Sequence, residues 1–150
     1  MRSHQGRGII EIYNGFVLDD VYLACENIRA ILNCINNTVG LNSDQYFDVR
    51  IIISELIQNA IKHGNESGSG DRKIYMKVFL KDKSVLNIIV RDQGSGFNAN
   101  RTLQQEHNRQ MCSVHDLMEC GRGLQIVKSL SDSVMFNRKG NRITVLKKLF

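Results

Sequence analysis

Three short segments in a fixed order constrain this chain more than any other feature of its sequence. Predicted strands and helices separate them, and each lies at or near the end of such an element. In chain order they read Glu55-Leu56-Ile57-Gln58-Asn59-Ala60-Ile61-Lys62-His63, then Asp92-Gln93-Gly94-Ser95-Gly96-Phe97, then Gly121-Arg122-Gly123-Leu124. Any one of these segments is a weak signal by itself, but the three in this order form a specific pattern.

Hydrophobic periodicity predicts the elements that hold these segments. Alternating apolar residues predict strands over 8–16, 74–80, 86–90, 133–137 and 142–149, with turns at 81–83 and 139–141. Helical spacing predicts a helix that begins at Asp19 or Asp20 and stops at Gly40. A second helix is expected from Ser43 or Asp44 to His63, ended by Gly64, and a third from Gly123 to Leu130.

The order of these elements predicts the fold class. Strand, two helices, two strands, helix and two strands indicate an α+β fold, a two-layer α/β sandwich with helices on one face of a mixed, mostly antiparallel sheet. Residues 98–120 are polar and lack periodicity. Internal loops of that length are typical of functional lids or of disorder.

Composition favours one folded domain over 1–150. The 150 residues are 42% hydrophobic and 23% charged, as in ordinary globular proteins. No apolar run approaches the ~20 residues of a transmembrane helix, and residues 1–8 are polar and basic rather than a secretory signal. We therefore expect a cytoplasmic protein with no membrane partner.

The net charge is +5 at pH 7, but basic residues are scattered along the sequence. No basic stripe interleaved with aromatic residues is evident, so we expect solvated surface and no direct nucleic-acid partner. Cys25 and Cys34 fall in a helical pattern and are interpreted as small apolar side chains. A second group of cysteine and histidine residues leaves zinc binding open as an alternative, although their spacing matches no familiar zinc site. These residues are His107, Cys112, His115 and Cys120.

The first segment places polar groups along one edge of an apolar helix face. Glu55, Asn59 and His63 are spaced by four, and Lys62 stands beside them. An amide oxygen can bind Mg²⁺, a carboxylate can accept a proton, and an ammonium group can meet a phosphate. The alternative is an ordinary amphipathic helix whose polar side carries these residues.

The other two segments suit a nucleotide. Asp92, at a strand end, could accept the amino proton of adenine, while Gly94 and Gly96 let the ring approach the backbone; a simple turn is the alternative. The Gly121-Arg122-Gly123 turn opens a helix, whose free N–H groups favour phosphate, and the Arg122 side chain could add a charged contact. The alternative here is a glycine-containing helix start. Neither a P-loop nor a strand–GxGxxG–helix pattern is present, and the three segments together predict an ATP site.

These residues resemble the N, G1 and G2 boxes of the GHKL (Bergerat-fold) ATPase superfamily, which includes gyrase, histidine kinases and bacterial anti-sigma serine kinases. The resemblance covers about residues 8–150. Because the chain has no room for the helix pair of a histidine kinase or for the further domains of gyrase, it most resembles the anti-sigma factor/serine-protein kinase group. Members of that group often have a proline after the G1 box, where this chain has Asn98-Ala99.

The resemblance implies roles for individual residues. Glu55 would be the general base toward a substrate serine, and Asn59 would be the Mg²⁺ ligand. Asp92 would bind the adenine amino group in a pocket shaped by Gly94 and Gly96. The remaining matches would contact phosphates beside an ATP lid at about 98–120; they are Lys62, His63, Gly121, Arg122 and Gly123.

The resemblance also implies partners. The protein would bind ATP and Mg²⁺, form a homodimer, capture a sigma factor and phosphorylate a serine of an anti-anti-sigma (STAS-type) antagonist, thereby regulating transcription. One alternative is a nucleotide-binding regulatory switch without kinase activity, and another is a detached histidine-kinase-like ATPase domain. Glu55 favours the kinase, since a binding module needs no base at that position.

Overall fold

The structure is a computed structural model that describes residues 8–18, 20–66, 73–92 and 122–150. Along the chain, the described elements are β1 (Ile9–Leu18), α1 (Val21–Val39), α2 (Ser43–Glu66), β2 (Lys73–Lys81), β3 (Val85–Arg91), α5 (Arg122–Leu130), β4 (Ser133–Phe136) and β5 (Arg142–Lys148). The 98–120 segment, the four candidate zinc ligands and Gly94, Gly96 and Gly121 lie outside the described residues.

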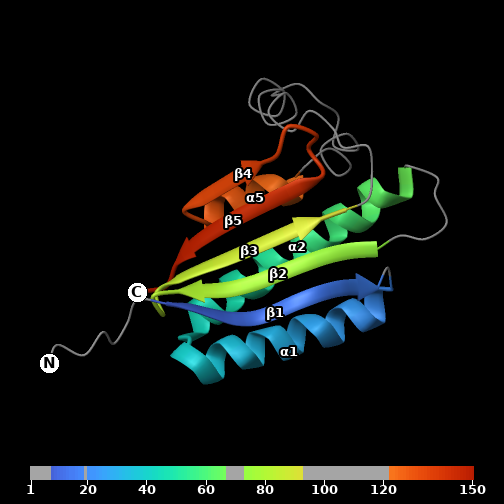
Figure 1. Ribbon diagram of the computed structural model, residues 1–150. Coiled ribbons are helices and arrows are strands. Elements are labelled where there is room, and N and C mark those ends of the chain that lie inside the picture. Colours follow the sequence, from blue (N-terminus) through green and yellow to red (C-terminus); the bar gives the residue numbers. More distant parts are fainter. Residues whose placement is uncertain (1–7, 19, 67–72, 93–121) are drawn as a thin grey trace, which may run out of the picture.

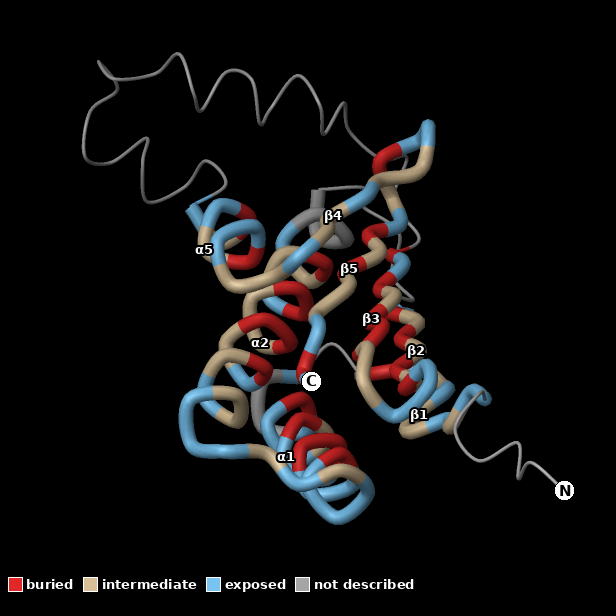
Figure 2. Tube along the Cα trace, turned by 90° about the vertical axis from the view of Figure 1, so that its left-hand side faces the viewer, coloured by how far each residue is buried: buried red, intermediate tan, exposed pale blue. Residues whose placement is uncertain are grey.

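The five strands form one sheet in the order β1-β2-β3-β5-β4 (Figure 1). The helices α1, α2 and α5 all lie on one face of it, so the described part has two layers (Figure 2). The predicted α+β two-layer sandwich is confirmed. The sheet, expected to be mixed and mostly antiparallel, is wholly antiparallel among the described strands. Short turns join β2 to β3 and β4 to β5, and a strand that returns through such a turn pairs antiparallel.

The core lies between the two layers. In β2 every second residue is buried, which turns one set of side chains toward the helices and the other set away from them. The helix α2 contributes a set of fully buried apolar side chains from the helical layer. Its fully buried side chains, all at 0–1% exposure, are Val49, Ile52, Ile53, Leu56 and Ile57. The apolar face predicted for this helix is therefore its core face.

Local capping explains where the first two helices begin. The Leu23 N–H donates to Asp20 Oδ1 at 3.3 Å, which confirms the predicted cap of α1. The same helix stops at Gly40, whose φ of 68° is the left-handed conformation that glycine tolerates. Asn42 and Gln45 form a reciprocal box before α2, since each side chain accepts from the other's backbone N–H, at 2.8 and 3.0 Å.

One other local prediction is wrong. The helix α2 continues through Gly64 to Glu66, because an internal glycine costs only about 1 kcal/mol and tertiary context can override it. Cys25 and Cys34, interpreted as small apolar side chains, are free and exposed on α1. The buried stripe of that helix consists of Ala24, Ile28, Ile31, Leu32 and Ile35.

The two hairpin turns are confirmed. Between β2 and β3, Asp82 and Lys83 both have positive φ, at 54° and 55°, and the Ser84 N–H donates to Lys81 O at 3.1 Å. This is the pattern of the tight turn that matches strand twist. Between β4 and β5, Gly140 has a φ of 70°. Among the described helices, none is long and apolar enough to cross a membrane.

Candidate functional site

The helix α2 presents the first group of candidate residues. Glu55 and Asn59 are half-buried and lie one turn apart, beside the fully buried Leu56. Lys62 is exposed about one turn further on. The backbone of His63 is helical, but its side chain is outside the described part. Because the neighbouring positions are locked into the core, the carboxyl and amide groups project from a rigid element at the edge of the helical layer.

The beginning of α5 packs against Glu55. A Cβ built on Gly123 would collide with Glu55 Oε2 and lie 3.3 Å from Glu55 Cδ. The carboxylate thus occupies the space that any side chain at position 123 would need. Leu124 and Val127, at 3% and 0% exposure, join the core on the same side of α5, which packs against α2. A side chain at this position would therefore displace the Glu55 carboxylate from its place beside the first turn of α5.

This contact joins the first and third sequence segments. The first turn of a helix has N–H groups without intrahelical partners and the positive end of the helix dipole. Arg122, the first residue of α5, is exposed. The Glu55 carboxylate and the first turn of α5, which begins with Arg122, therefore lie close together although they come from separate parts of the chain. Such a set can hold a phosphate group and a proton acceptor side by side.

Asp92 lies directly after β3 and is only 8% exposed. Its backbone N–H donates to Asn141 O at 2.9 Å. Within the described ranges, Asp92 and Asn87 are the buried polar residues. A carboxyl group that is removed from water requires specific polar partners, so Asp92 is not a residue of a solvated turn.

The β4–β5 hairpin supports Asp92, and sequence reasoning missed this role. The side chain of Asn137 accepts from the backbone N–H groups of Asn141 and Arg142, at 3.0 and 3.1 Å. Its Nδ2 donates to Asn141 Oδ1 at 2.6 Å. These bonds fix the carbonyl of Asn141 that receives the Asp92 N–H. Asn137 and Asn141 on either side of the glycine turn could have indicated this role in the sequence, since asparagine side chains in turns often hydrogen-bond to nearby backbone groups.

The candidate residues lie toward one end of the sheet. In Figure 1, the C-terminal ends of α2 and β3 point to the same end of the molecule. Arg91, the last residue of β3, pairs with Arg142, the first residue of β5. The fold therefore brings Glu55 together with Gly123 and places Asp92 at the β5 edge of the same end. Within the described residues, no group of three or more His, Cys, Asp or Glu side chains could hold a metal ion by itself.

The sequence of this chain is similar to those of known proteins. A family profile described as "Histidine kinase-like ATPase domain" matches residues 21–147. The "Anti-sigma F factor" of Priestia megaterium is 30% identical over 91 residues, which is 61% of this chain and 59% of that protein. The "Serine-protein kinase RsbW" of Oceanobacillus iheyensis is 26% identical over 124 residues, or 80% of this chain and 75% of that protein.

A further relative agrees in name and extent. The "Serine-protein kinase RsbW" of Staphylococcus aureus strain MSSA476 is 29% identical over 127 residues, which is 80% of this chain and 76% of that protein. This chain thus spans less than two thirds of the Priestia protein and about three quarters of the two kinases. Since the family profile runs from the start of α1 into β5, the chain belongs to the family of histidine kinase-like ATPase domains.

Proposed function

We propose that this protein is an ATP-dependent serine-protein kinase that also acts as an anti-sigma factor. It binds a sigma factor and transfers phosphate to a serine of an anti-anti-sigma (STAS-type) protein. The names of its relatives support this role. The observation that favours it most is the position of the Glu55 carboxylate. It lies beside the first turn of α5, in space left open because Gly123 has no side chain.

The nucleotide would lie between the end of β3 and the first turn of α5. The carboxylate of Asp92 accepts the adenine amino proton, and Gly94 and Gly96 shape the pocket beside it. The residues proposed to contact the phosphates are Lys62, His63, Gly121, Arg122 and Gly123. The burial of Asp92 and the lack of a side chain at Gly123 fit a ligand with a planar base at one end and phosphates at the other.

Magnesium binding is proposed at Asn59. An amide oxygen is a suitable hard ligand, and Mg²⁺ is normally held by one or two protein oxygens together with phosphates and water. The half-burial of Asn59, one turn from Glu55, fits this role. Bound Mg²⁺ would neutralise charge on the phosphates. One chain ligand is enough for such a site, so the lack of a wider cluster of ligands in the described part is compatible with it.

Glu55 accepts the proton of the substrate serine hydroxyl while the serine oxygen attacks the γ-phosphorus and ADP leaves. Phosphoryl transfer depends chiefly on positioning and on stabilising charge. The buried neighbours of Glu55 on α2 and the backbone of Gly123 restrict where the carboxylate can lie. The chain acts as a single domain over 1–150, in the cytoplasm and as a homodimer.

The test separates binding from transfer. Glu55→Gln keeps the shape of the side chain but loses the base, so it is expected to bind ATP and the sigma factor normally. Its rate of phosphate transfer from labelled ATP to the antagonist should fall by ~10²–10⁴-fold. The control is Glu26→Gln, which changes an exposed carboxylate on α1. Transfer by Glu55→Gln at the wild-type rate would exclude Glu55 as the base.

A second candidate is a nucleotide-responsive switch that binds partners without transferring phosphate. It is favoured if the wild-type protein binds ATP and the sigma factor but phosphorylates no serine of the antagonist. Mass spectrometry of the antagonist after incubation with ATP and Mg²⁺ distinguishes the two candidates.

A further inference from the structure

The sheet has a face that no described helix covers. The helices α1, α2 and α5 lie together on the other side (Figure 2). Figure 1 is viewed onto the uncovered side, with the strands in front of the helices. Antiparallel partners share a face of a sheet, so the strand register identifies the residues on this side. Three of its cross-strand rows are Tyr75–Arg91–Arg142, Lys77–Ile89–Thr144 and Lys81–Val85–Lys148.

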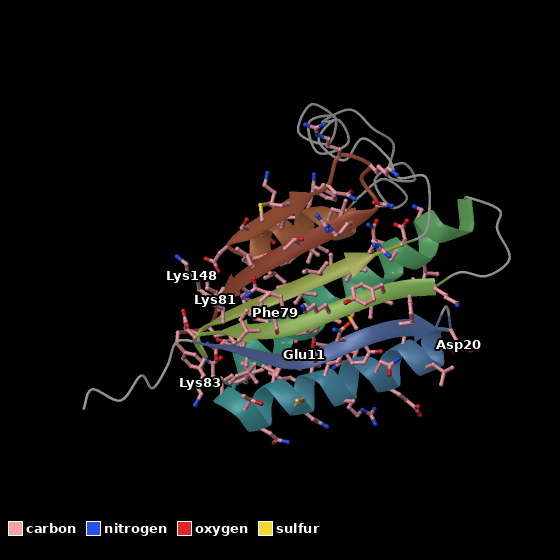
Figure 3. The ribbon with its side chains drawn as sticks, viewed as in Figure 1. Glu11, Asp20, Phe79, Lys81, Lys83 and Lys148 are labelled. Atoms are coloured by element: carbon pink, nitrogen blue, oxygen red, sulfur yellow. The ribbon has the colours of Figure 1, made fainter. Side chains whose placement is uncertain are left out.

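This open sheet face is strongly basic. Its strand positions include six basic residues: Lys73, Lys77, Lys81, Arg91, Arg142 and Lys148. Glu11, paired with Phe79, is the acidic residue among the described strand positions of this face. Its carboxylate accepts from Asn14 Nδ2 at 2.9 Å. In Figure 3, Glu11, Phe79, Lys81 and Lys148 can be seen on this side of the sheet.

The linear sequence contains no basic stripe interleaved with aromatic residues, but the folded sheet places basic and aromatic residues together on this face. The residues concerned alternate along β2 and are spread over β1, β3 and β5, so they gather only when the strands pair. Apolar side chains lie among the charges. Phe16 is 57% exposed, and Met135, on the edge strand β4, is 53% exposed.

The aromatic rings of this face are held by cations. Lys73 Nζ lies 5.7 Å from the Phe16 ring centre, and Lys77 Nζ lies 5.4 Å from that of Phe79. Arg91 Cζ lies 5.9 Å from the Tyr75 ring centre. The rings of Phe16 and Tyr75 meet edge to face, at 5.9 Å and 70°. Exposed cation–π pairs of this kind are weak but favourable, so they order long side chains before a partner arrives.

We propose that the open sheet face docks an acidic protein segment with apolar residues among its carboxylates. This face has six basic residues and one acidic residue, so it favours a negatively charged partner. Aromatic residues, Met and Arg are also the residues enriched at protein interfaces. This surface lies across the sheet from α2 and α5, so its partner is separate from the proposed nucleotide.

Two other occupants suit the surface less well. Single-stranded nucleic acid needs free ring faces for base stacking, whereas three aromatic rings here are paired with cations. A second copy of the same face would oppose basic residues to basic residues, which is unfavourable. These occupants are alternative outcomes of the test.

The test uses the full chain and a fluorescent 20-residue peptide of Glu, Leu and Phe as the probe. Lys77→Glu/Lys148→Glu changes the open sheet face, while Arg29→Glu/Lys128→Glu changes exposed residues on α1 and α5 and alters net charge equally. Anisotropy titrations should show affinity about tenfold lower for the first double variant. The second should bind the peptide almost as the wild type does. Circular dichroism checks that both variants fold.

Three results would overturn the proposal. Equal loss of peptide affinity in both double variants would mean that only net charge matters. Tighter binding of a labelled (dT)20 oligonucleotide than of the peptide, lost in Lys77→Glu/Lys148→Glu alone, would assign the face to nucleic acid. A change of mass in sedimentation equilibrium for that variant alone would assign it to contact between copies of the chain.

Discussion

Replacing Gly123 by alanine tests whether the fold positions the proposed base. The new Cβ would collide with Glu55 Oε2 and approach Glu55 Cδ to 3.3 Å. Restoring an ordinary contact distance requires the carboxylate to move by about 1 Å. A misplacement of that size in a catalytic site can lower the rate by ~10²-fold. That factor corresponds to about 2.7 kcal/mol in the barrier to transfer.

The stability of the fold should change much less. Alanine favours a helix over glycine by up to ~1 kcal/mol, and an off-rotamer Glu55 side chain costs ~0.5–1.5 kcal/mol. The two effects oppose each other, so we expect the free energy of unfolding to change by less than ~1 kcal/mol. The matched control is Gly8→Ala, where an added Cβ meets nothing within 4 Å.

A double-mutant cycle supplies the decisive assay. Transfer of labelled phosphate is measured for the wild type, Gly123→Ala, Glu55→Gln and the double variant, together with ATP affinity by calorimetry. If Gly123 acts through Glu55, alanine lowers the rate strongly in the wild-type background and hardly at all in the Glu55→Gln background. An equal loss in both backgrounds, with weaker ATP binding, would refute this reasoning and assign Gly123 to the phosphates alone. A wild-type rate for Gly123→Ala would refute the geometry itself.

Three further predictions concern the rest of the site. Asn59→Ala should weaken ATP binding in Mg²⁺ buffer much more than in EDTA, because its amide oxygen is the proposed metal ligand; the exposed Gln58→Ala is the control, and equal losses in both buffers would indicate a role in the fold instead. Asp92→Asn should lower ATP affinity, because the amide is no longer an acceptor only; wild-type binding of GTP as tight as that of ATP in calorimetry would argue against adenine recognition. Asn137→Ala should lower the free energy of unfolding by ~1–3 kcal/mol in urea titrations, because it removes the acceptor of two backbone N–H groups, at 3.0 and 3.1 Å; an unchanged midpoint would contradict that accounting.

Local signals predicted the individual elements well. The cap of α1 at Asp20, its stop at Gly40 and the turn at Gly140 are all confirmed. Each depends on groups a few residues apart, so a short window of sequence contains the relevant physics. The predicted stop at Gly64 failed because one internal glycine costs a helix only about 1 kcal/mol and does not by itself end it. The exposure of Cys25 could not be predicted in this way, because a residue near an apolar stripe can still lie outside it.

The candidate site divides in the same way. The three ordered segments were sufficient to identify the family, and helical spacing was sufficient to place Glu55 and Asn59 one turn apart. The sequence did not reveal that Glu55 fills the space beside Gly123, or that Asn141 receives the Asp92 N–H. Both contacts join elements far apart in the chain, and they form only when α5 packs on α2 and β5 pairs with β3.

The sequence by itself determined the two-layer fold, the caps and turns, and which residues of each strand share a face, because these follow from periodicity and local hydrogen bonding. The tertiary structure decided which strands became neighbours, because strand order is a choice among long-range pairings that the whole core makes together. The order β1-β2-β3-β5-β4 gathers scattered lysines and arginines on one open face. Beneath the sheet, the packing of α5 on α2 brings a carboxylate against a glycine that leaves room for it.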